Sequence, residues 1–366
     1  MRSILEAFHE YRVSDLGIRI VDRDEELLEM LKLLRFGEDV DPRNSLIYVV
    51  SGPWGCGKTE FARALTRALS TAKEVIATYI NVPQSFALEE FYGTTPSEIV
   101  GIVENFVENF LGDRGKLLFN LYKLVKHLVN ALKVRNRRLV LIFDEVTSTL
   151  DRYRVSIRDL VAGLSKEIYD AAWSFGCEVY VVMLTSECTA LYDFKREEGK
   201  NMVVYQMWHL DKKHLARILE ELGSPHDVEA VWKLCGGCPR AVYELWRREW
   251  MLERWVSPYI DKVRISLQSY ARSHRVAEKE LLREISRLVE DLDALELHPL
   301  WNEFLKNNVV TPIFSEWLGG KAPPNEAWIG NSIAFQMPIY RTVLETMAEE
   351  GRLGVESSKV LRRALS

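Results

Sequence analysis

Residues 52–59 combine glycines with a lysine and a hydroxyl residue at a spacing that suits phosphate binding. The pattern is Gly52-x-x-x-x-Gly57-Lys58-Thr59, and it follows the apolar run 46–51 directly. Glycines allow a backbone course in which successive N–H groups converge on a phosphate chain. Lys58 is then placed to reach the β- and γ-phosphates, and the Thr59 hydroxyl to ligate Mg²⁺.

Residues 60–69 continue with helical apolar spacing, and the N-terminus of a helix favours an anion. A Gly-rich turn that happens to precede a helix is the alternative, but strand, loop and helix stand in the order that the mechanism needs. The pattern predicts a nucleotide-binding segment made of Gly52, Pro53, Trp54, Gly55, Cys56, Gly57, Lys58, Thr59 and Glu60.

A pair of acids ends the apolar run 139–143. Such a run is typical of a strand buried on both faces of a parallel sheet. Asp144 at its carboxyl end is suited to hold Mg²⁺. Glu145, the next residue, is suited to polarise an attacking water. An acidic strand end that caps the following turn is the alternative. Because the pair suits water activation and no acceptor site is evident, the pattern favours hydrolysis over small-molecule phosphorylation.

A further buried strand is expected at 178–185, and it ends in Thr185 and Ser186. Either hydroxyl could sense the γ-phosphate, and we assign Thr185 as the first candidate. Serine and threonine also cap turns frequently. The sequence leaves the two interpretations open.

Length and composition set wider limits. A chain of 366 residues predicts two or three domains, and 47% hydrophobic with 28% charged residues is ordinary for a globular protein. The sequence has no apolar run of about 18 residues and no apolar signal core near its start, so we expect no membrane association and a cytoplasmic location. A net charge of −5 argues against nonspecific nucleic-acid binding by the whole surface.

Strand patterns alternate with helical patterns over the first two hundred residues, which predicts an α/β fold with a parallel sheet. Catalytic groups then gather at the carboxyl ends of the strands. Strands are expected at 46–51, 74–82, 138–144, 178–185 and 202–208, and helices at 94–111, 116–133 and 155–173.

Helical patterns dominate after Leu210. Asp211 is a plausible N-cap for a helix over 212–222, and another helix is expected at 226–234. Cys235 and Cys238 are the only close cysteine pair among five, so a turn is favoured over a zinc site. Arg240 then lies near the start of a helix, where the macrodipole gives a cation nothing. Its position suggests a phosphate partner, with a solvent-facing arginine as the alternative.

The final third predicts a helix at 279–290, two extended segments at 309–314 and 328–335, and a closing helix at 341–353. Helices followed by a hairpin are typical of a winged helix. We therefore expect a nucleotide-binding core over 1–209, a helical region over 210–256 and a winged-helix-like domain over 257–366.

Four segments together resemble the archaeal ATPase family, within the broader STAND and AAA+-like P-loop NTPases. They are 20–27, Gly52–Thr59, Leu139–Glu145 and Leu234–Arg240. The resemblance implies ATP and Mg²⁺ as ligands, a sheet in the order 5-1-4-3-2, and kinship with archaeal origin-recognition initiators. It further implies that 1–209 is an ATPase core and that 210–256 is a helical lid. It also implies that Ile20 and Val21 flank the adenine and that Arg240 contacts the γ-phosphate. The lack of a guanine-reading Asn-Lys-x-Asp segment agrees with ATP.

One departure concerns catalysis in trans. Family members often carry an arginine just before strand five, whereas this chain has Glu197-Glu198-Gly199-Lys200 there. Lys200 or Arg196 would have to substitute, and lysine lacks the planar fork of arginine. The sequence leaves the oligomeric state open.

Three functions follow from these patterns. The first is a slow ATP-hydrolysing molecular switch, with Glu145, Lys58, Thr185 and Arg240 as its catalytic residues. The second is a DNA-binding initiator or mobile-element ATPase, although 18 basic and 18 acidic residues balance from Pro239 onward. The third is a scaffold whose C-terminal domain binds a protein partner.

Overall fold

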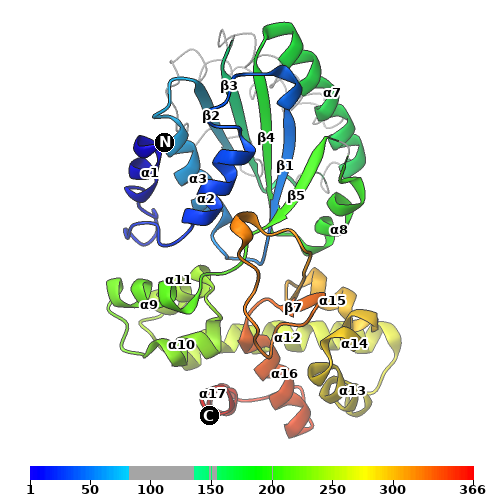
Figure 1. The fold of residues 1–366 in the computed structure, drawn as a ribbon. Helices are drawn as coiled ribbons and strands as arrows, with labels where there is room; N and C mark the ends of the chain where they lie inside the picture. The colour runs from blue at the N-terminus through cyan, green and yellow to red at the C-terminus, as the bar shows by residue number, and fades with distance from the viewer. Residues whose placement is uncertain (82–135, 148–149, 151–154, 200) are drawn as a thin grey trace, which may run out of the picture. The chain divides into compact units, whose positions relative to one another are not determined.

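The structure is a computed structural model of the full chain (Figure 1). It describes all residues except 82–135, 148–149, 151–154 and 200. The helices expected at 94–111 and 116–133 lie outside the described residues. None of the helices in the described part of the chain combines the length and apolar character that crossing a lipid bilayer requires.

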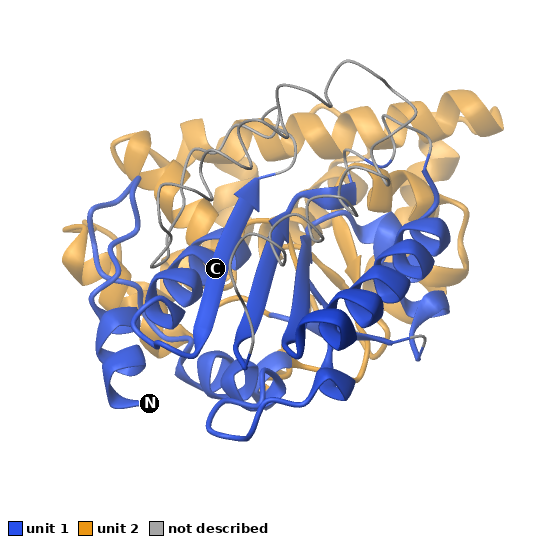
Figure 2. Ribbon diagram, turned by 90° about the horizontal axis from the view of Figure 1, so that it is seen from above, with its two compact units in different colours: residues 1–51, 58–207, 318–320 blue, residues 52–57, 208–317, 321–366 orange. Residues whose placement is uncertain are grey.

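Two compact units make up the described chain, and Figure 2 distinguishes them by colour. Unit 1 comprises Met1–Ser51, Lys58–Met207 and Leu318–Gly320. Unit 2 comprises Gly52–Gly57, Trp208–Trp317 and Lys321–Ser366. The phosphate-loop residues 52–57 therefore pack with unit 2, although the chain on either side of them belongs to unit 1.

Unit 1 is built on a parallel sheet of five strands in the order β2-β3-β4-β1-β5. This confirms the α/β fold and the strand order 5-1-4-3-2. The observed strands are β1 (Leu46–Ser51), β2 (Val75–Asn81), β3 (Arg138–Asp144), β4 (Glu178–Thr185) and β5 (Met202–Gln206). The last strand ends two residues before the predicted end at 208.

Apolar runs explain why these segments form the middle of the sheet. Every residue of β3 and β4 is buried, as expected for parallel strands that are covered on both faces. The register aligns Ser51 of β1 with Thr185 of β4, and Asn81 of β2 with Asp144 of β3. Polar side chains thus follow the apolar runs at the same edge of the sheet, where such sheets bind ligands.

Helices flank the sheet within unit 1 (Figure 1). Helix α3 packs against β2 and β3, α7 against β4 and β1, and α8 against β5. The Ser156 hydroxyl accepts the Asp159 N–H at the start of α7, and Gly176 ends that helix in the left-handed conformation. The elements are α1 (Arg2–His9), α2 (Asp24–Leu33), η1 (Pro42–Asn44), α3 (Lys58–Leu69), α7 (Ile157–Phe175), α8 (Cys188–Glu197) and η2 (Leu318–Gly320).

Unit 2 is largely helical. Asp211 accepts the His214 N–H, so it caps a helix as the sequence predicts. Asp227 accepts the Ala230 N–H and caps the next helix, which begins at Val228 rather than at 226. Its helices are α9 (Lys212–Glu221), α10 (Val228–Cys235), α11 (Pro239–Arg247), α12 (Leu252–His274), α13 (Glu278–Glu290), α14 (Leu292–Leu297), α15 (Leu300–Lys306), α16 (Pro338–Glu350) and α17 (Ser357–Leu365).

The extended segments of the final third form a small antiparallel pair, β6 (Val310–Pro312) and β7 (Ile333–Phe335). The following helix, α16, begins at Pro338 rather than near 341, because proline suits the first turn of a helix. It ends before Gly351, which takes a positive φ. The assignment of a winged helix stays a prediction, as do the three domain boundaries.

Candidate functional site

The carboxylate of Asp144 lies at the end of β3 and is buried, with 3% of its surface exposed. Its Oδ2 accepts hydrogen bonds from the Thr59 hydroxyl, at 2.7 Å, and from the Tyr79 hydroxyl, at 2.7 Å. Thr59 is the second residue of α3, and Tyr79 lies on the neighbouring strand β2. A buried carboxylate needs such partners because burial otherwise disfavours its charge.

Thr59 and Asp144 are also the residues whose chemistry suits a magnesium ion. Mg²⁺ takes oxygen ligands and is usually bound by one or two protein groups together with the phosphates of a nucleotide. A hydroxyl and a carboxylate within 2.7 Å of each other form such a donor set. The two residues that the sequence assigned to the metal are therefore neighbours within unit 1.

Glu145 follows Asp144 in a strained conformation. Its φ is +56°, in the left-handed region that residues other than glycine rarely adopt. Its N–H donates to Asp144 Oδ1 at 3.0 Å, and its Oε1 accepts from the Ser186 hydroxyl at 3.1 Å. Burial raises the pKa of Glu145, and the Asp144 charge adds to the rise. The hydrogen bond from Ser186 and the charge of Lys58 lower the pKa of Glu145 and partly offset that rise.

The two hydroxyls at the end of β4 have different surroundings. The Thr185 hydroxyl lies 3.1 Å from the Thr147 hydroxyl and accepts the Glu187 N–H at 3.2 Å. It therefore caps the turn that follows the strand. Ser186, in contrast, contacts the carboxylate of Glu145. The γ-phosphate role assigned to Thr185 stays a prediction, and Ser186 is the hydroxyl that touches the acid pair.

The loop between β1 and α3 has the backbone that its glycines predict. Gly55 and Gly57 take φ values of +76° and +101°. The Cys56 N–H donates to the Pro53 carbonyl at 3.2 Å, so the loop turns upon itself. A Cβ on Gly55 would lie 2.4 Å from the Cβ of Arg240, because α11 approaches the loop closely within unit 2.

Backbone and sulfur contacts join the loop to α11. The Arg240 N–H donates to the Gly55 carbonyl at 3.2 Å. The Cys238 thiol lies 3.7 Å from the Trp54 carbonyl and 3.6 Å from that of Gly55, as a donor. Burial raises the pKa of Cys238 to about 12 and that of Cys235 well above its ordinary value. Gly236 and Gly237 both take positive φ values between the two cysteines, so the chain turns there.

Residues 20–245 match a family described as an ATPase domain predominantly from Archaea. The chain belongs to this archaeal ATPase family. The match includes all four segments on which the resemblance rested, 20–27, 52–59, 139–145 and 234–240. Membership makes the chain a nucleotide-binding P-loop ATPase at the level of the family. No curated protein matches the sequence.

Two solved structures are among those similar to this chain. The ORC2 protein of Aeropyrum pernix in ADPNP–ADP complexes is 14% identical, with 94% of this chain and 98% of that chain covered and a TM-score of 0.46. The Cdc6p protein of Pyrobaculum aerophilum is also 14% identical, with 94% and 98% covered and a TM-score of 0.39.

The Arg240 side chain of this archaeal ATPase is 46% exposed. Its guanidinium lies over the rings of Trp54, at 5.7 Å, and Tyr243, at 5.3 Å. Its Nε donates to Glu244 at 3.3 Å. The arginine thus lies beside a phosphate-loop residue while remaining half exposed. The contact with the γ-phosphate stays a prediction.

The segment assigned to the adenine is anchored in unit 1. The Ile20 N–H donates to the Tyr11 carbonyl at 3.0 Å, and Val21 is buried. The Tyr11 hydroxyl donates to Glu60 of α3 at 2.8 Å. The segment of Ile20 and Val21 is thereby tied to the helix that carries Lys58 and Thr59. Its role beside adenine stays a prediction.

Two further charged residues had been assigned expected roles. Lys200 lies outside the described residues. Arg196, at the end of α8, is 77% exposed and pairs with Asp193 at 3.0 Å. Its role in trans stays a prediction.

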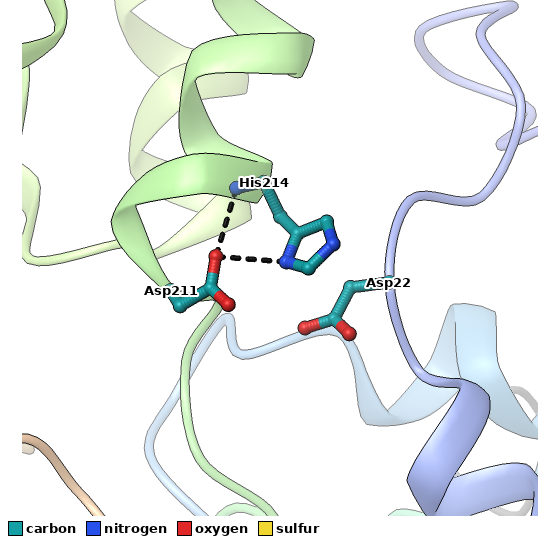
Figure 3. A group of neighbouring side chains, drawn as sticks. All are labelled: Asp22, Asp211 and His214. Atoms are coloured by element: carbon teal, nitrogen blue, oxygen red, sulfur yellow. Dashed lines mark hydrogen bonds and ion pairs between the residues drawn. The ribbon is translucent and has the colours of Figure 1, made fainter.

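Asp211 accepts hydrogen bonds from the backbone N–H and from the ring Nδ1 of His214, so it caps the start of α9 (Figure 3).

Sequence reasoning missed two residues that contact the phosphate-binding elements. Tyr79 binds Asp144 from β2, and its only signal was a polar hydroxyl near the carboxyl end of an apolar strand. Gln336 contacts the loop at Trp54. Nothing in the local pattern around 336 could have signalled that contact, because the two residues lie 282 positions apart.

Proposed function

We propose that this chain is a Mg²⁺-dependent ATP-hydrolysing molecular switch. The observation that supports this most is the pair of adjacent acids with different partners. Asp144 is held by the Thr59 and Tyr79 hydroxyls, whereas Glu145 is held by Ser186 in a left-handed conformation. Strain of this kind persists where the surrounding structure imposes it, and it gathers at functional sites.

Each residue then has a role. Thr59 and Asp144 would hold Mg²⁺, which would neutralise phosphate charge when bound. Lys58, buried at the start of α3, neutralises the phosphates. Glu145 orients the attacking water and accepts its proton, for which its raised pKa is suited.

The switch itself would involve α11 and the segments around it. Arg240 responds to the γ-phosphate, supported by its position over Trp54 and by the bond from its N–H to Gly55. Ile20 and Val21 flank the adenine, and Thr185 at the end of β4 senses the γ-phosphate. The lid over 210–256 and the winged-helix-like domain over 257–366 would respond to the nucleotide that is bound.

The test is phosphate release from Mg-ATP by the wild type and by Glu145→Gln. The variant keeps the shape of the side chain but cannot accept a proton, so we expect turnover to fall about 100-fold or more while ATP affinity stays within about twofold. Glu74→Gln is the matched control, because Glu74 is an exposed acid just before β2. Its turnover should equal that of the wild type.

Unchanged phosphate release in Glu145→Gln would remove Glu145 from the mechanism. A second arm omits Mg²⁺ and adds a chelator. Release that persists without the ion would contradict the metal role of Thr59 and Asp144.

A further inference from the structure

Gln336 occupies a fixed position after β7. Its side chain is buried, with 2% of the residue exposed. Its Nε2 donates to the Val310 carbonyl at 3.2 Å, and its backbone N–H donates to the Val309 carbonyl at 2.9 Å. The ring Nε2 of His209 lies 2.8 Å from the backbone carbonyl oxygen of Gln336. Since Nε2 is committed to Val310, the orientation of the amide is set and Oε1 must face the other way.

Oε1 of Gln336 accepts the backbone N–H of Trp54 at 2.7 Å. Trp54 is the third residue of the phosphate loop. Its carbonyl oxygen lies 3.7 Å from the Cys238 thiol of the segment before α11. The peptide groups on both sides of Trp54 are therefore held by residues of unit 2, one by Gln336 and the other by Cys238.

We infer that Gln336 is a positioning residue for nucleotide binding, acting through the Trp54 amide. This inference rests on the nucleotide-binding part of the proposed function. A phosphate loop must hold several N–H groups in a convergent arrangement, and the cost of ordering them reduces affinity. A buried, rigid acceptor fixes the first half of the loop before the ligand arrives, so the N–H groups from Gly55 to Lys58 need less ordering.

The contact also works in the other direction. Whatever Gln336 contributes to nucleotide affinity, the nucleotide contributes equally to the stability of the Gln336 position. Gln336 directly follows β7 and donates to the Val310 carbonyl of β6. Bound ADP should therefore stabilise both strands. The stability of the β6–β7 pair should thus depend on whether a nucleotide is bound to the loop.

The experiment compares Gln336→Leu with wild type by calorimetric titration with ADP and by hydrogen exchange. Leucine has a similar size but no acceptor, so the Trp54 amide loses its buried partner. We expect ADP to bind about tenfold more weakly, and the Trp54 amide to exchange faster without ligand. Thr346→Val is the matched control, because it removes a buried hydrogen bond in α16 that does not reach the loop. Its ADP affinity should be unchanged.

Two further measurements separate positioning from a merely structural role. Gln336→Glu keeps an acceptor oxygen but loses the donor to the Val310 carbonyl, so it should restore part of the protection of the Trp54 amide. In the wild type, ADP should slow exchange over residues 309–312 and 333–336. Absence of that slowing overturns the inference even if Gln336→Leu does not fold.

The outcomes distinguish this inference from the proposed function. ADP binding requires no hydrolysis, so failure of the Glu145 assignment leaves the test intact. Equal ADP affinity in wild type and Gln336→Leu overturns the positioning role alone. A wild-type chain that binds no ADP overturns both.

Discussion

At the scale of residues, two neighbouring carboxylates have different environments. Asp144 is buried and accepts three hydrogen bonds, from Thr59, Tyr79 and the Glu145 N–H. Glu145 is less buried, and its Oε1 accepts a hydrogen bond from the Ser186 hydroxyl. Burial and the Asp144 charge raise the pKa of Glu145 above its ordinary value.

The pH dependence of hydrolysis tests this environment. Glu145 must be ionised to act as a base, so turnover should fall as pH drops through its raised pKa. The Ser186 hydroxyl lowers that pKa, so Ser186→Ala should move the acid limb of kcat to higher pH. Ser70→Ala, which changes an exposed hydroxyl at the end of α3, should leave the profile in place. An acid limb that Ser186→Ala does not move would contradict the contact.

The same shift has a consequence for stability. A carboxyl group whose pKa is raised by folding favours the folded state fully below its unfolded pKa. That contribution is lost as pH rises through the folded pKa. At neutral pH, Glu145→Gln should therefore be at least as stable as the wild type. Urea denaturation of the two proteins measures this, and a less stable variant would show that the charge is favourable in place.

At the scale of elements, the phosphate loop depends on the start of α11. Gly55 combines a positive φ with the approach of Arg240 and Cys238, so two separate costs oppose any side chain there. Gly199 shares the first condition only, since it has φ +88° and nothing within 4 Å of a Cβ. The two glycines therefore separate backbone strain from steric contact.

Gly55→Ala should abolish detectable ADP binding, because its Cβ would lie 2.4 Å from the Arg240 Cβ and must displace the loop or α11. Gly199→Ala should cost about 1–2 kcal/mol of unfolding free energy for its left-handed backbone and leave ADP affinity unchanged. Titration calorimetry and denaturation measure the two quantities. Equal ADP affinity in Gly55→Ala and wild type would show that the loop adapts freely.

At the scale of the whole molecule, residues 52–57 join the chain of unit 1 to the packing of unit 2. The loop begins and ends on β1 and α3, yet its backbone is held by Cys238, Arg240 and Gln336. A ligand that binds this folded loop and not the unfolded chain should therefore raise the free energy of unfolding.

Thermal denaturation with ADP tests that expectation. A ligand at one hundred times its Kd stabilises the folded state by about 2.7 kcal/mol, so the wild-type melting temperature should rise. Lys58→Ala removes the buried cation at the start of α3 and should lose the rise. Lys73→Ala, at an exposed lysine, should keep it. An equal rise in Lys58→Ala would show that ADP binds elsewhere.

The sequence by itself determined the order and type of the elements. Apolar runs such as 139–143 predict buried strands because a strand inside a parallel sheet is covered on both faces. The spacing from Gly52 to Thr59 identified the loop, and Asp144 and Glu145 followed from their place at a strand end. Boundaries moved where a local signal outweighed the pattern, as when Pro338 began α16 earlier than predicted.

Only the tertiary structure decided which side chains meet. Tyr79 reaches Asp144 because β2 and β3 pair in one register, and Gln336 reaches Trp54 across 282 positions. It also separated Thr185, which caps a turn, from Ser186, which contacts Glu145. Such contacts depend on the packing of distant segments, which leaves no periodic signal in the residues themselves. The sequence therefore predicts the chemistry of the loop, whereas the fold determines what holds it in place.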